Sequence, residues 1–285
     1  MSGAGLGSHG QGGTVGYLET MFGLTGSVAV ITGGGGVLAG HMAEALLKAG
    51  ASVSLWGPHA TSLRETAERA GAAAEAGSRI TWTLADAGSE DSVAAAAEAT
   101  VGQLGRLDIL VNAVGGNTGK GPLLETDIAL FEEIFRLNLV AGMLVPTKVI
   151  CRQWKASGVH GSIVNMASMA SYVPLSGVWA YDAAKAAVLN LTTAAAKELA
   201  PQGIRVNAIA PGFFLGKQNR ALLVDEKTGR LTQRGESVIS RTPFGRFGEP
   251  QELAGALLFL ASPRAAGFVT GVCIPVDGGF LTDNI

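Results

Sequence analysis

A tyrosine and a lysine four residues apart are the pair in this sequence best suited to proton transfer. Tyr181 and Lys185 lie in an alanine-rich run with helical spacing, which places both side chains on one face of a helix. A free phenol has a pKa near ~10 and transfers protons poorly at neutral pH, but a neighbouring ammonium group lowers that pKa. The pair therefore predicts a general acid/base, although the same spacing also arises by chance in ordinary helices.

A serine upstream could hold the oxygen atom on which such an acid acts. Ser168 follows the β-branched run 162–166, so we expect it just beyond the carboxyl end of a strand. Open α/β sheets bind their ligands at that end. The hydroxyl of Ser168 could orient a substrate carbonyl against the phenol of Tyr181. The alternative is a serine that only starts a turn, a role that Ser171 would fill equally well.

A glycine-rich segment near the start of the chain predicts a phosphate-binding turn. Residues 33–36 are all glycine, and they connect the apolar run 28–32 to a helical pattern that begins at Val37 and Leu38. Glycines let the backbone approach a pyrophosphate closely, and the following helix N-terminus presents free N–H groups. The spacing differs from the common G-x-G-x-x-G fingerprint, so a plain strand-to-helix turn is the alternative.

The elements that must position these residues alternate regularly along the chain. Short β-branched runs are followed by alanine-rich stretches with helical spacing, which is typical of βαβ units. We predict an α/β fold, a single doubly wound Rossmann-type domain with a mostly parallel seven-stranded sheet. The domain should span residues 21–285 after a flexible Gly/Ser-rich tail at residues 1–20. The expected strands are residues 28–32, 52–56, 80–84, 109–112, 162–166, 205–209 and 271–275.

A polar, irregular stretch interrupts this alternation around residues 212–248. Long excursions of this kind in a compact α/β domain are usually functional. We therefore expect a substrate lid there, and the alternative is a solvated insertion without a role.

Composition argues against several classes of partner. The 285 residues are 47% hydrophobic and 15% charged, with a formal net charge of -2. Such a chain lacks the basic field of a nucleic-acid-binding protein. No apolar stretch approaches the ~20 residues of a membrane span, and the N-terminus does not resemble a signal peptide, so we expect a cytoplasmic protein. Cys151 and Cys273 are expected to be buried free thiols, and no metal site is expected.

The order of these motifs resembles the short-chain dehydrogenase/reductase family over residues 21–280. Members of this family transfer a hydride between a nicotinamide cofactor and a ketone or secondary alcohol. The resemblance therefore implies a small-molecule substrate and a homo-oligomer, commonly a tetramer. The motifs that carry it are Thr32-Gly33, Asn112-Ala113, Asn138, Ser168, Tyr181 with Lys185, Pro211-Gly212 and Asp277-Gly278-Gly279.

The resemblance implies a catalytic tetrad of Asn138, Ser168, Tyr181 and Lys185. Tyr181 would exchange a proton with the reacting oxygen while Ser168 hydrogen-bonds it. Lys185 would bind the nicotinamide ribose and depress the pKa of Tyr181, and Asn138 would hold a water that leads protons to Lys185. Asp86 would lie beside the adenine, and Asn112 would support the sheet near the cofactor. The implied cofactor-binding residues are Gly33, Gly35, Gly36, Val37, Leu38, Asp86, Asn112, Tyr181, Lys185, Pro211 and Gly212.

The sequence departs from the family pattern in three respects. Val37 and Ala39 stand where the glycine motif has its last two glycines, and Gly216 stands where many members carry a threonine that contacts the nicotinamide carboxamide. The second strand ends in residues 56–59, which offer neither an acid for a ribose 2′-hydroxyl nor an arginine for a 2′-phosphate. We therefore expect NAD or NADP as cofactor, with a slight preference for NAD.

A closer resemblance is to the D-mannonate oxidoreductase (fructuronate reductase) branch, which acts on sugar acids. It implies a substrate such as fructuronate or mannonate, with the guanidinium of Arg220 matching the carboxylate. Alternatives are a gluconate-type polyol, a 3-oxoacyl thioester or a steroid-like ketone, and a cofactor-binding regulator without turnover. The segments that carry the closer resemblance are 33–38, 114–117, 210–215, 218–223 and 242–248. The expected substrate-binding residues are Asn117, Ser168, Gln218, Asn219 and Arg220.

Overall fold

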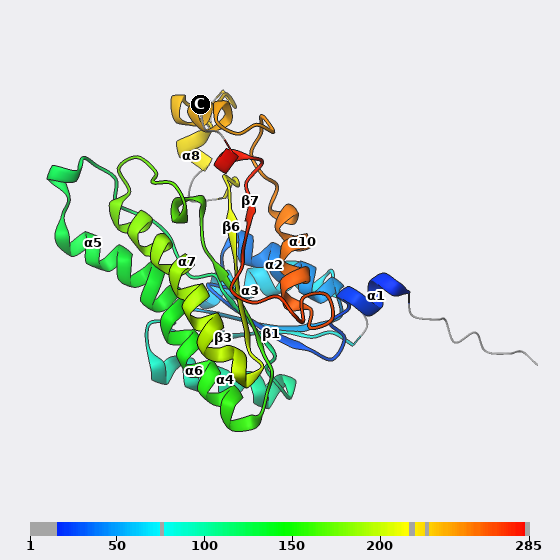
Figure 1. Ribbon diagram of the computed structural model, residues 1–285. Coiled ribbons are helices and arrows are strands. Elements are labelled where there is room, and N and C mark those ends of the chain that lie inside the picture. Colours follow the sequence, from blue (N-terminus) through cyan, green and yellow to red (C-terminus); the bar gives the residue numbers. More distant parts are fainter. Residues whose placement is uncertain (1–15, 75–76, 217–219, 226–227, 283–285) are drawn as a thin grey trace, which may run out of the picture.

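Seven strands form one sheet in this computed structural model, which describes residues 16–74, 77–216, 220–225 and 228–282 (Figure 1). The strands are β1 (Val28–Thr32), β2 (Ser52–Gly57), β3 (Ile80–Leu84), β4 (Ile109–Asn112), β5 (Ser162–Met166), β6 (Arg205–Pro211) and β7 (Cys273–Val276). Their order in space is β3-β2-β1-β4-β5-β6-β7. All six pairings are parallel, where the sequence predicted a mostly parallel sheet. The order reverses between β1 and β4, and a ligand crevice is expected beyond the carboxyl ends of strands at such a point.

Helices cover both faces of the sheet (Figure 1). On one face lie α2 (Val37–Lys48), α3 (Ala60–Gly71) and α10 (Ala254–Ala261). On the other face lie α4 (Glu90–Leu104), α6 (Val145–Ser157) and α7 (Trp179–Leu199). Because both faces are covered, the central strands β1, β4 and β5 are buried along their whole length. The predicted doubly wound α/β domain is confirmed.

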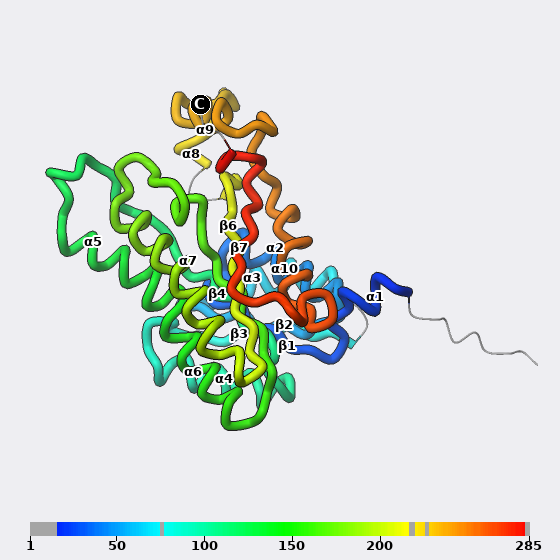
Figure 2. The backbone as a smooth tube through the Cα atoms, viewed as in Figure 1, coloured from blue at the N-terminus to red at the C-terminus, as the bar shows by residue number. Residues whose placement is uncertain are grey.

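Two segments, one near the N-terminus and the predicted lid, lie outside the regular alternation of strands and helices. A short helix, α1 (Tyr17–Phe22), occupies the last part of the segment predicted to be a flexible tail, and Ser262 Oγ donates a hydrogen bond to the carbonyl of Met21 in it (2.6 Å). Figure 2 shows the predicted lid at the opposite end of the molecule, beyond the carboxyl ends of β6 and β7. It contains α8 (Arg220–Leu223) and α9 (Gln233–Ser240).

The lid region has a small apolar core of its own. Leu223, Val224 and Val238 are buried there, against Phe213 and Phe247. This part of the chain is therefore folded and packed rather than a structureless loop.

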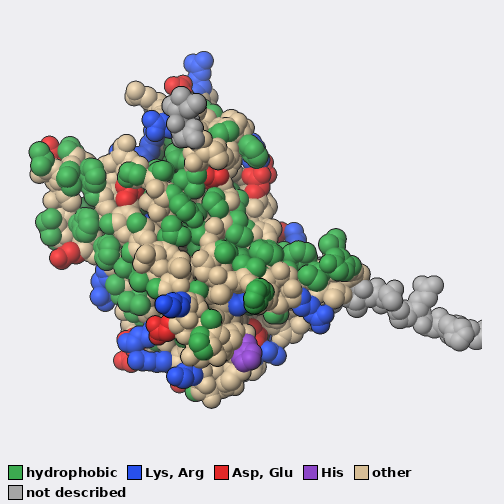
Figure 3. Space-filling view, viewed as in Figure 1, with side chains coloured by type: hydrophobic (Ala, Val, Ile, Leu, Met, Phe, Trp, Pro, Cys, Tyr) green, Lys and Arg blue, Asp and Glu red, His purple; other side chains and the backbone are tan. Residues whose placement is uncertain are grey.

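A long continuous helix carries exposed apolar side chains along one side of the molecule. It runs from α5 (Ile128–Phe135) through the π-helix η2 (Arg136–Leu144) into α6. Figure 3 shows hydrophobic side chains gathered over α5 and the segment before it. Among them Leu124 is 98% exposed and Ile128 67% exposed. No helix of the described residues is both long and apolar enough to cross a membrane.

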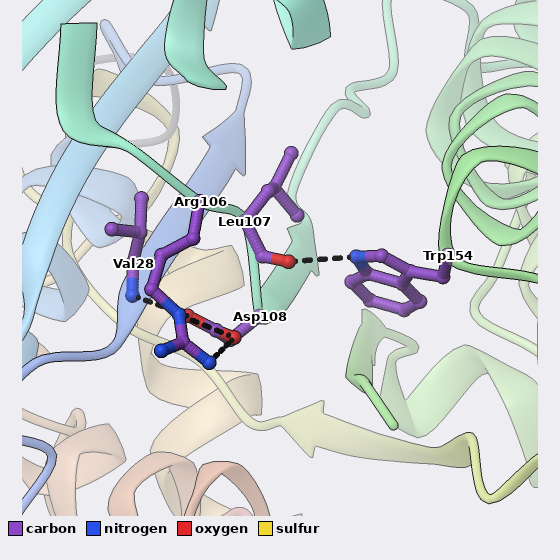
Figure 4. Close-up of polar contacts among 5 residues, drawn as sticks. All are labelled: Val28, Arg106, Leu107, Asp108 and Trp154. Atoms are coloured by element: carbon purple, nitrogen blue, oxygen red, sulfur yellow. Dashed lines mark hydrogen bonds and ion pairs between the residues drawn. The ribbon is translucent and has the colours of Figure 1, made fainter. Parts of the chain in front are cut away.

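The amino ends of the central strands are fixed by a small polar cluster (Figure 4). Asp108 Oδ2 accepts a hydrogen bond from the backbone N–H of Val28 (2.9 Å), and Arg106 makes a forked ion pair with the same carboxylate. On the other side, Trp154 Nε1 donates to the carbonyl of Leu107 (2.8 Å). The cluster holds β4 in register with β1 and ties α6 to the sheet, far from the carboxyl ends where the candidate site lies.

Candidate active site

Helix α7 places the predicted acid/base pair on one face. Lys185 Nζ lies 5.7 Å from the centroid of the Tyr181 ring. The lysine is only 4% exposed, and its Nζ donates a 2.7 Å hydrogen bond to the carbonyl of Met166 at the end of β5. Burial lowers the pKa of Lys185 to about 8, because a low-dielectric environment disfavours the ammonium form. The ammonium is therefore anchored at the carboxyl end of the sheet, beside the phenol.

The protonation of Tyr181 differs from the sequence-based expectation. Its pKa is raised above the ordinary value, first by burial of the phenol and then by the negative charge of Asp182, while a hydrogen bond with Ser168 lowers it. The expected lowering by Lys185 is not among the causes of this shift, of which desolvation of the phenolate is the largest. At neutral pH the phenol is protonated, which is the form that can donate a proton to a carbonyl oxygen.

Ser168 and Ser171 divide the two roles that the sequence left open. Ser168 is 5% exposed and lowers the pKa of the nearby phenol of Tyr181, while its Oγ accepts from the backbone N–H of Ala170 (3.1 Å). Ser171 Oγ accepts from the backbone N–H of Ser168 (3.3 Å) and donates to the carbonyl of Lys185 (2.7 Å). Ser171 thus fixes the turn against α7, and Ser168 is the serine directed at the acid.

Asn138, the fourth predicted catalytic residue, lies near Lys185. It is fully buried in η2, and its Nδ2 donates to the carbonyls of Gly116 (2.6 Å) and Ile134 (2.9 Å). Its Oδ1 accepts from the N–H of Gly116 (3.1 Å). A Cβ atom at Gly115 would lie 2.7 Å from Asn138 Oδ1 and 3.3 Å from Lys185 Nζ. All four predicted catalytic residues therefore meet at the carboxyl ends of β4 and β5.

The glycine turn after β1 fits a pyrophosphate group. Gly33 has a φ of 66°, a left-handed conformation that favours glycine, and a Cβ there would lie 2.9 Å from the carbonyl of Ala113. Gly36 is the N-cap of α2 and has no side chain to cap the helix. The N–H groups of Val37 and Leu38 at the start of α2 therefore receive no hydrogen bond from a capping side chain. Such a helix N-terminus attracts an anion. The valine and alanine in place of the family's last two glycines leave this turn intact.

Asp86 and Asn112 occupy different environments near this turn. Asp86 is exposed after β3, and its Oδ1 accepts from the N–H of Gly88 (2.8 Å). Asn112 is buried, and its Nδ2 donates to Asn165 Oδ1 (2.8 Å) and Thr147 Oγ1 (3.0 Å). Asn112 therefore links β4 to β5 and α6, in agreement with a role in supporting the sheet.

Sequence reasoning missed the partners of Asn112. Asn165 lies directly opposite Asn112 in the register of β4 and β5. Its Nδ2 donates a hydrogen bond to Thr192 Oγ1 in α7 (3.0 Å), so the hydrogen bonds continue from β4 through β5 to α7. An asparagine at the same height in two consecutive buried strands was the available signal, since buried amides need partners.

Pro211 and Gly212 lie where β6 leaves the sheet. A Cβ at Gly212 would lie 2.6 Å from Asp277 Cα, so this glycine is required by a close approach of two backbones. A cavity of about 310 Å³ opens beside them, and Phe244 and Thr242 also line it. The cavity separates the end of the sheet from the lid.

The expected substrate-binding residues are only partly placed. Gln218 and Asn219 lie outside the described residues. Arg220 is exposed at the start of α8, and Asn117 is exposed with its Nδ2 donating to the carbonyl of Gly119 (2.8 Å). Ser168, the remaining member of this set, lies near the phenol of Tyr181 and lowers its pKa.

Further candidate groups are the residues after β2, the two cysteines and any side chains that could bind a metal. Pro58 and His59 after β2 are exposed, and no side chain there adds an acid or an arginine. Cys151 is buried with a pKa raised to about 12 by burial, whereas Cys273 is only partly buried, so the prediction of two buried thiols is wrong for the second. Both thiols are free. Within the described residues no three His, Cys, Asp or Glu side chains are grouped as metal ligands.

Known proteins of similar sequence and structure agree with this geometry. A family model described as enoyl-(acyl carrier protein) reductase matches residues 36–281. An uncharacterized oxidoreductase, UxuB, from Bacillus subtilis is 39% identical over 277 residues, covering 90% of this chain and 96% of its own. A 2-dehydro-3-deoxy-D-gluconate 5-dehydrogenase from Dickeya dadantii is 35% identical, covering 91% of this chain and 97% of its own.

Solved structures give the same result. A candidate D-mannonate oxidoreductase from Haemophilus influenzae with bound NAD superposes with a TM-score of 0.84 at 33% identity, covering 92% of this chain and 97% of its own. A candidate 2-deoxy-D-gluconate 3-dehydrogenase from Agrobacterium tumefaciens with bound NADP has a TM-score of 0.79 at 32% identity, covering 92% and 99%. With this fold, these relatives and these motifs, the chain belongs to the short-chain dehydrogenase/reductase family of oxidoreductases.

Proposed function

We propose that this oxidoreductase interconverts a ketone and a secondary alcohol on a sugar acid, such as fructuronate and mannonate. The observation that carries the chemistry is the phenol of Tyr181, which is largely removed from water and lies beside Lys185 and near Ser168. The substrate class is supported by relatives named for sugar-acid reactions, among them the Dickeya dadantii and Haemophilus influenzae proteins. The polar lid beyond β6 also favours a hydrophilic substrate over an apolar one.

A nicotinamide cofactor, when bound, supplies or accepts the hydride. The glycine turn and the amino end of α2 would hold its pyrophosphate through Gly33, Gly35, Gly36, Val37 and Leu38, because they combine close backbone approach with free N–H groups. Asp86, Asn112, Pro211 and Gly212 would line the rest of the cofactor site. We retain the slight preference for NAD, since Gly57 and Pro58 offer no side chain to grip either ribose substituent. A kcat/KM for NADPH that greatly exceeds that for NADH would refute it.

The four predicted catalytic residues would manage the proton. In reduction, Tyr181 donates its phenolic proton to the carbonyl oxygen as the carbonyl carbon gains the hydride, and in oxidation the phenolate takes the proton back. Ser168 hydrogen-bonds the same oxygen and holds it near the phenol. Lys185 stabilises the phenolate with its positive charge and would bind the ribose hydroxyls. Asn138 would hold a water through which Lys185 and Tyr181 regain their protons.

The carboxylate of the substrate would bind Arg220, with Asn117, Gln218 and Asn219 serving the sugar hydroxyls. A guanidinium offers two parallel donors to a carboxylate, and such a charge-assisted bond is worth roughly 1.5–3 kcal/mol. Arg220→Ala should therefore lower kcat/KM for fructuronate by about 10- to 100-fold and affect an uncharged keto sugar much less. Arg230→Ala is the matched control, because Arg230 is also an exposed arginine of the lid. Equal losses on both substrates would refute the assignment of Arg220.

A reductase of an acyl thioester is the second candidate, since the matching family model is described as an enoyl-(acyl carrier protein) reductase. A panel of keto-uronates, aldonates, polyols, 3-oxoacyl thioesters and steroid-like ketones, assayed with both cofactors, separates the candidates. Turnover of the thioesters alone would replace the sugar-acid proposal. No turnover of any member would favour a cofactor-binding regulator.

We also propose that the protein is a cytoplasmic homotetramer. The exposed apolar side chains near α5, including Leu123, Leu124 and Ile128, support an interface between copies, because large apolar patches usually mark contact surfaces. Light scattering of the purified chain should give four times the 29.0 kDa of one subunit. A monomer would contradict the proposal.

A further inference from the structure

Two loops beside the candidate active site are joined by hydrogen bonds through a single glycine. The β4 loop (residues 113–122) follows β4, and the β5 loop (residues 172–178) leads into α7. The backbone N–H of Gly121 in the β4 loop donates to the carbonyl of Gly177 in the β5 loop (3.0 Å). The carbonyl of the same Gly121 accepts from the indole Nε1 of Trp179, in the first turn of α7 (3.0 Å). Both backbone polar groups of Gly121 are therefore engaged.

The contact between the loops requires a glycine in the β5 loop. Gly177 has a φ of 75°, and a Cβ there would lie 3.1 Å from the carbonyl oxygen of Gly121. The backbones thus approach more closely than a side chain at this position would allow. This arrangement fixes how far apart the two loops can lie.

The β5 loop is also held from inside α7. The backbone N–H of Leu175 donates to Asp182 Oδ2 (3.1 Å), and Asp182 is only 9% exposed. Trp179 and Asp182 therefore anchor the two loops to the helix turn that carries Tyr181. Any shift of the loops relative to the phenol must break at least one of these bonds.

The β4 loop is fixed at a second point close to the tetrad. Gly116 exchanges two hydrogen bonds with the side chain of Asn138, at 3.1 Å and 2.6 Å. Between this point and Gly121 lie residues 117–120, which include exposed Asn117 and Lys120. Residues 117–120 are thus a short bridge with one end held by the tetrad and the other by Trp179.

We propose that Trp179 is a positioning residue that sets where residues 117–120 lie relative to the phenol of Tyr181, and so which hydroxylated ketones or alcohols fit. The inference rests on the proposed function in one respect, that residues 117–120 contact the substrate. The indole acts through its N–H donor and not through contact with the reacting atoms. Its removal should therefore weaken substrate binding without disturbing the proton chemistry.

Trp179→Phe removes the N–H donor and keeps an aromatic ring, so it is the variant to test. We expect the KM for the ketone to rise roughly two- to tenfold, the range for loss of one neutral hydrogen bond, with kcat and the KM for the cofactor nearly unchanged. Hydrogen–deuterium exchange over residues 114–125 should become faster, because without the indole donor to its carbonyl Gly121 is held less firmly, and its N–H, which is bonded to the carbonyl of Gly177, opens to solvent more often. Trp82→Phe is the matched control, since Trp82 in β3 is also about one-third exposed (37%, against 38% for Trp179) and should change neither measurement.

The exchange measurement needs no substrate, and the kinetics can use whichever ketone of the panel reacts. Failure of the sugar-acid proposal is therefore distinguishable from failure of this one. Wild-type exchange together with an unchanged KM in Trp179→Phe would overturn the positioning role. So would a parallel loss in kcat, ketone KM and cofactor KM, which would indicate general loosening of the site.

Discussion

At the scale of the residue, the environment of Tyr181 sets the pKa of its phenol and therefore its protonation state at neutral pH. Burial and the charge of Asp182 raise its pKa, and Ser168 and Lys185 lie close enough to stabilise the phenolate once the proton has left. That the four polar residues lie together was predictable from their order and spacing. The sign of the pKa shift was not, because it depends on how much water the folded chain removes from the phenol.

Tyr181→Phe should abolish turnover and leave the fold intact. The substitution deletes only the hydroxyl that exchanges the proton, and general acid/base groups contribute roughly 10²–10⁴-fold to the rate. Steady-state kinetics give the loss, and titration of cofactor fluorescence should show nearly unchanged cofactor binding. A variant with wild-type kcat would remove Tyr181 from the mechanism.

Asp182 gives a prediction for stability against pH. Burial raises its pKa from 3.8 to about 6, and one of its oxygens, Oδ1, is buried with no hydrogen-bond partner among the described residues. A carboxyl whose pKa rises on folding penalises the folded state above that pKa, and the penalty disappears as pH falls through about 6 toward 3.8. Asp182→Asn keeps an oxygen for Leu175 and should therefore raise Tm relative to wild type at about pH 8, with the gain shrinking toward about pH 4.5.

Thermal melts of both proteins across this range provide the measurement. Asp91→Asn, at an exposed carboxylate in the first turn of α4, is the control and should give a difference that varies little over the same range. If the gain of Asp182→Asn is the same at both ends of the range, the buried carboxylate is not the cause.

At the scale of the element, sequence patterns located most strands well and the last strand less well. The predicted runs 28–32, 109–112 and 162–166 are the observed β1, β4 and β5, since strands buried on both faces read as continuous β-branched runs. The last strand was predicted at 271–275 and is observed at Cys273–Val276, at the edge of the sheet. The edge strand β3 matches its predicted run 80–84, so edge position is not the cause. The predicted run began at Gly271, whose φ of 81° is left-handed and cannot belong to a strand.

The close fit of the β4 loop to the tetrad predicts a sensitive glycine. Gly115→Ala would place a Cβ 2.7 Å from Asn138 Oδ1, which must move, and Lys185 Nζ lies only slightly farther away. We expect kcat to fall roughly 10- to 100-fold, because displacements of about 1 Å have this effect on positioned groups. Gly102→Ala, in α4 with nothing within 4 Å of the added Cβ, serves as the control and should keep wild-type kcat. Wild-type activity in Gly115→Ala would show that the tetrad tolerates displacement.

At the scale of the whole molecule, the sheet, the glycine turn and the lid together predict a single cofactor crevice. The fold class and the family were predictable from the sequence because the motifs recur in a fixed order along one domain. The placement of the lid against the site was not, since Arg220 is exposed and an exposed side chain leaves no burial pattern in the sequence. Substrate choice depends on such surface residues, whereas the fold depends on the buried ones.

Cofactor binding should stabilise the entire domain. A ligand that binds only the folded state at about 100 times its Kd adds about 2.7 kcal/mol to the free energy of unfolding. For a domain of this size, this corresponds to a rise in Tm of roughly 5–10 °C. Differential scanning fluorimetry with NAD and with NADP tests both binding and preference. A Tm that neither cofactor changes would contradict the crevice.

The π-helix η2 has a consequence for how this gene can tolerate insertions and deletions. A π-helix holds more residues per turn than an α-helix, so η2 behaves like an α-helix that has absorbed additional residues between Phe135 and Val145. Deleting one residue before Asn138 would restore α-helical winding and rotate the amide by about 100°, away from Gly116. Deleting one after it would leave the amide in place and rotate α6 instead, away from the sheet. Reading-frame-preserving deletions should therefore be lost from viable libraries across Arg136–Leu144 and retained in exposed parts of the lid such as residues 228–231.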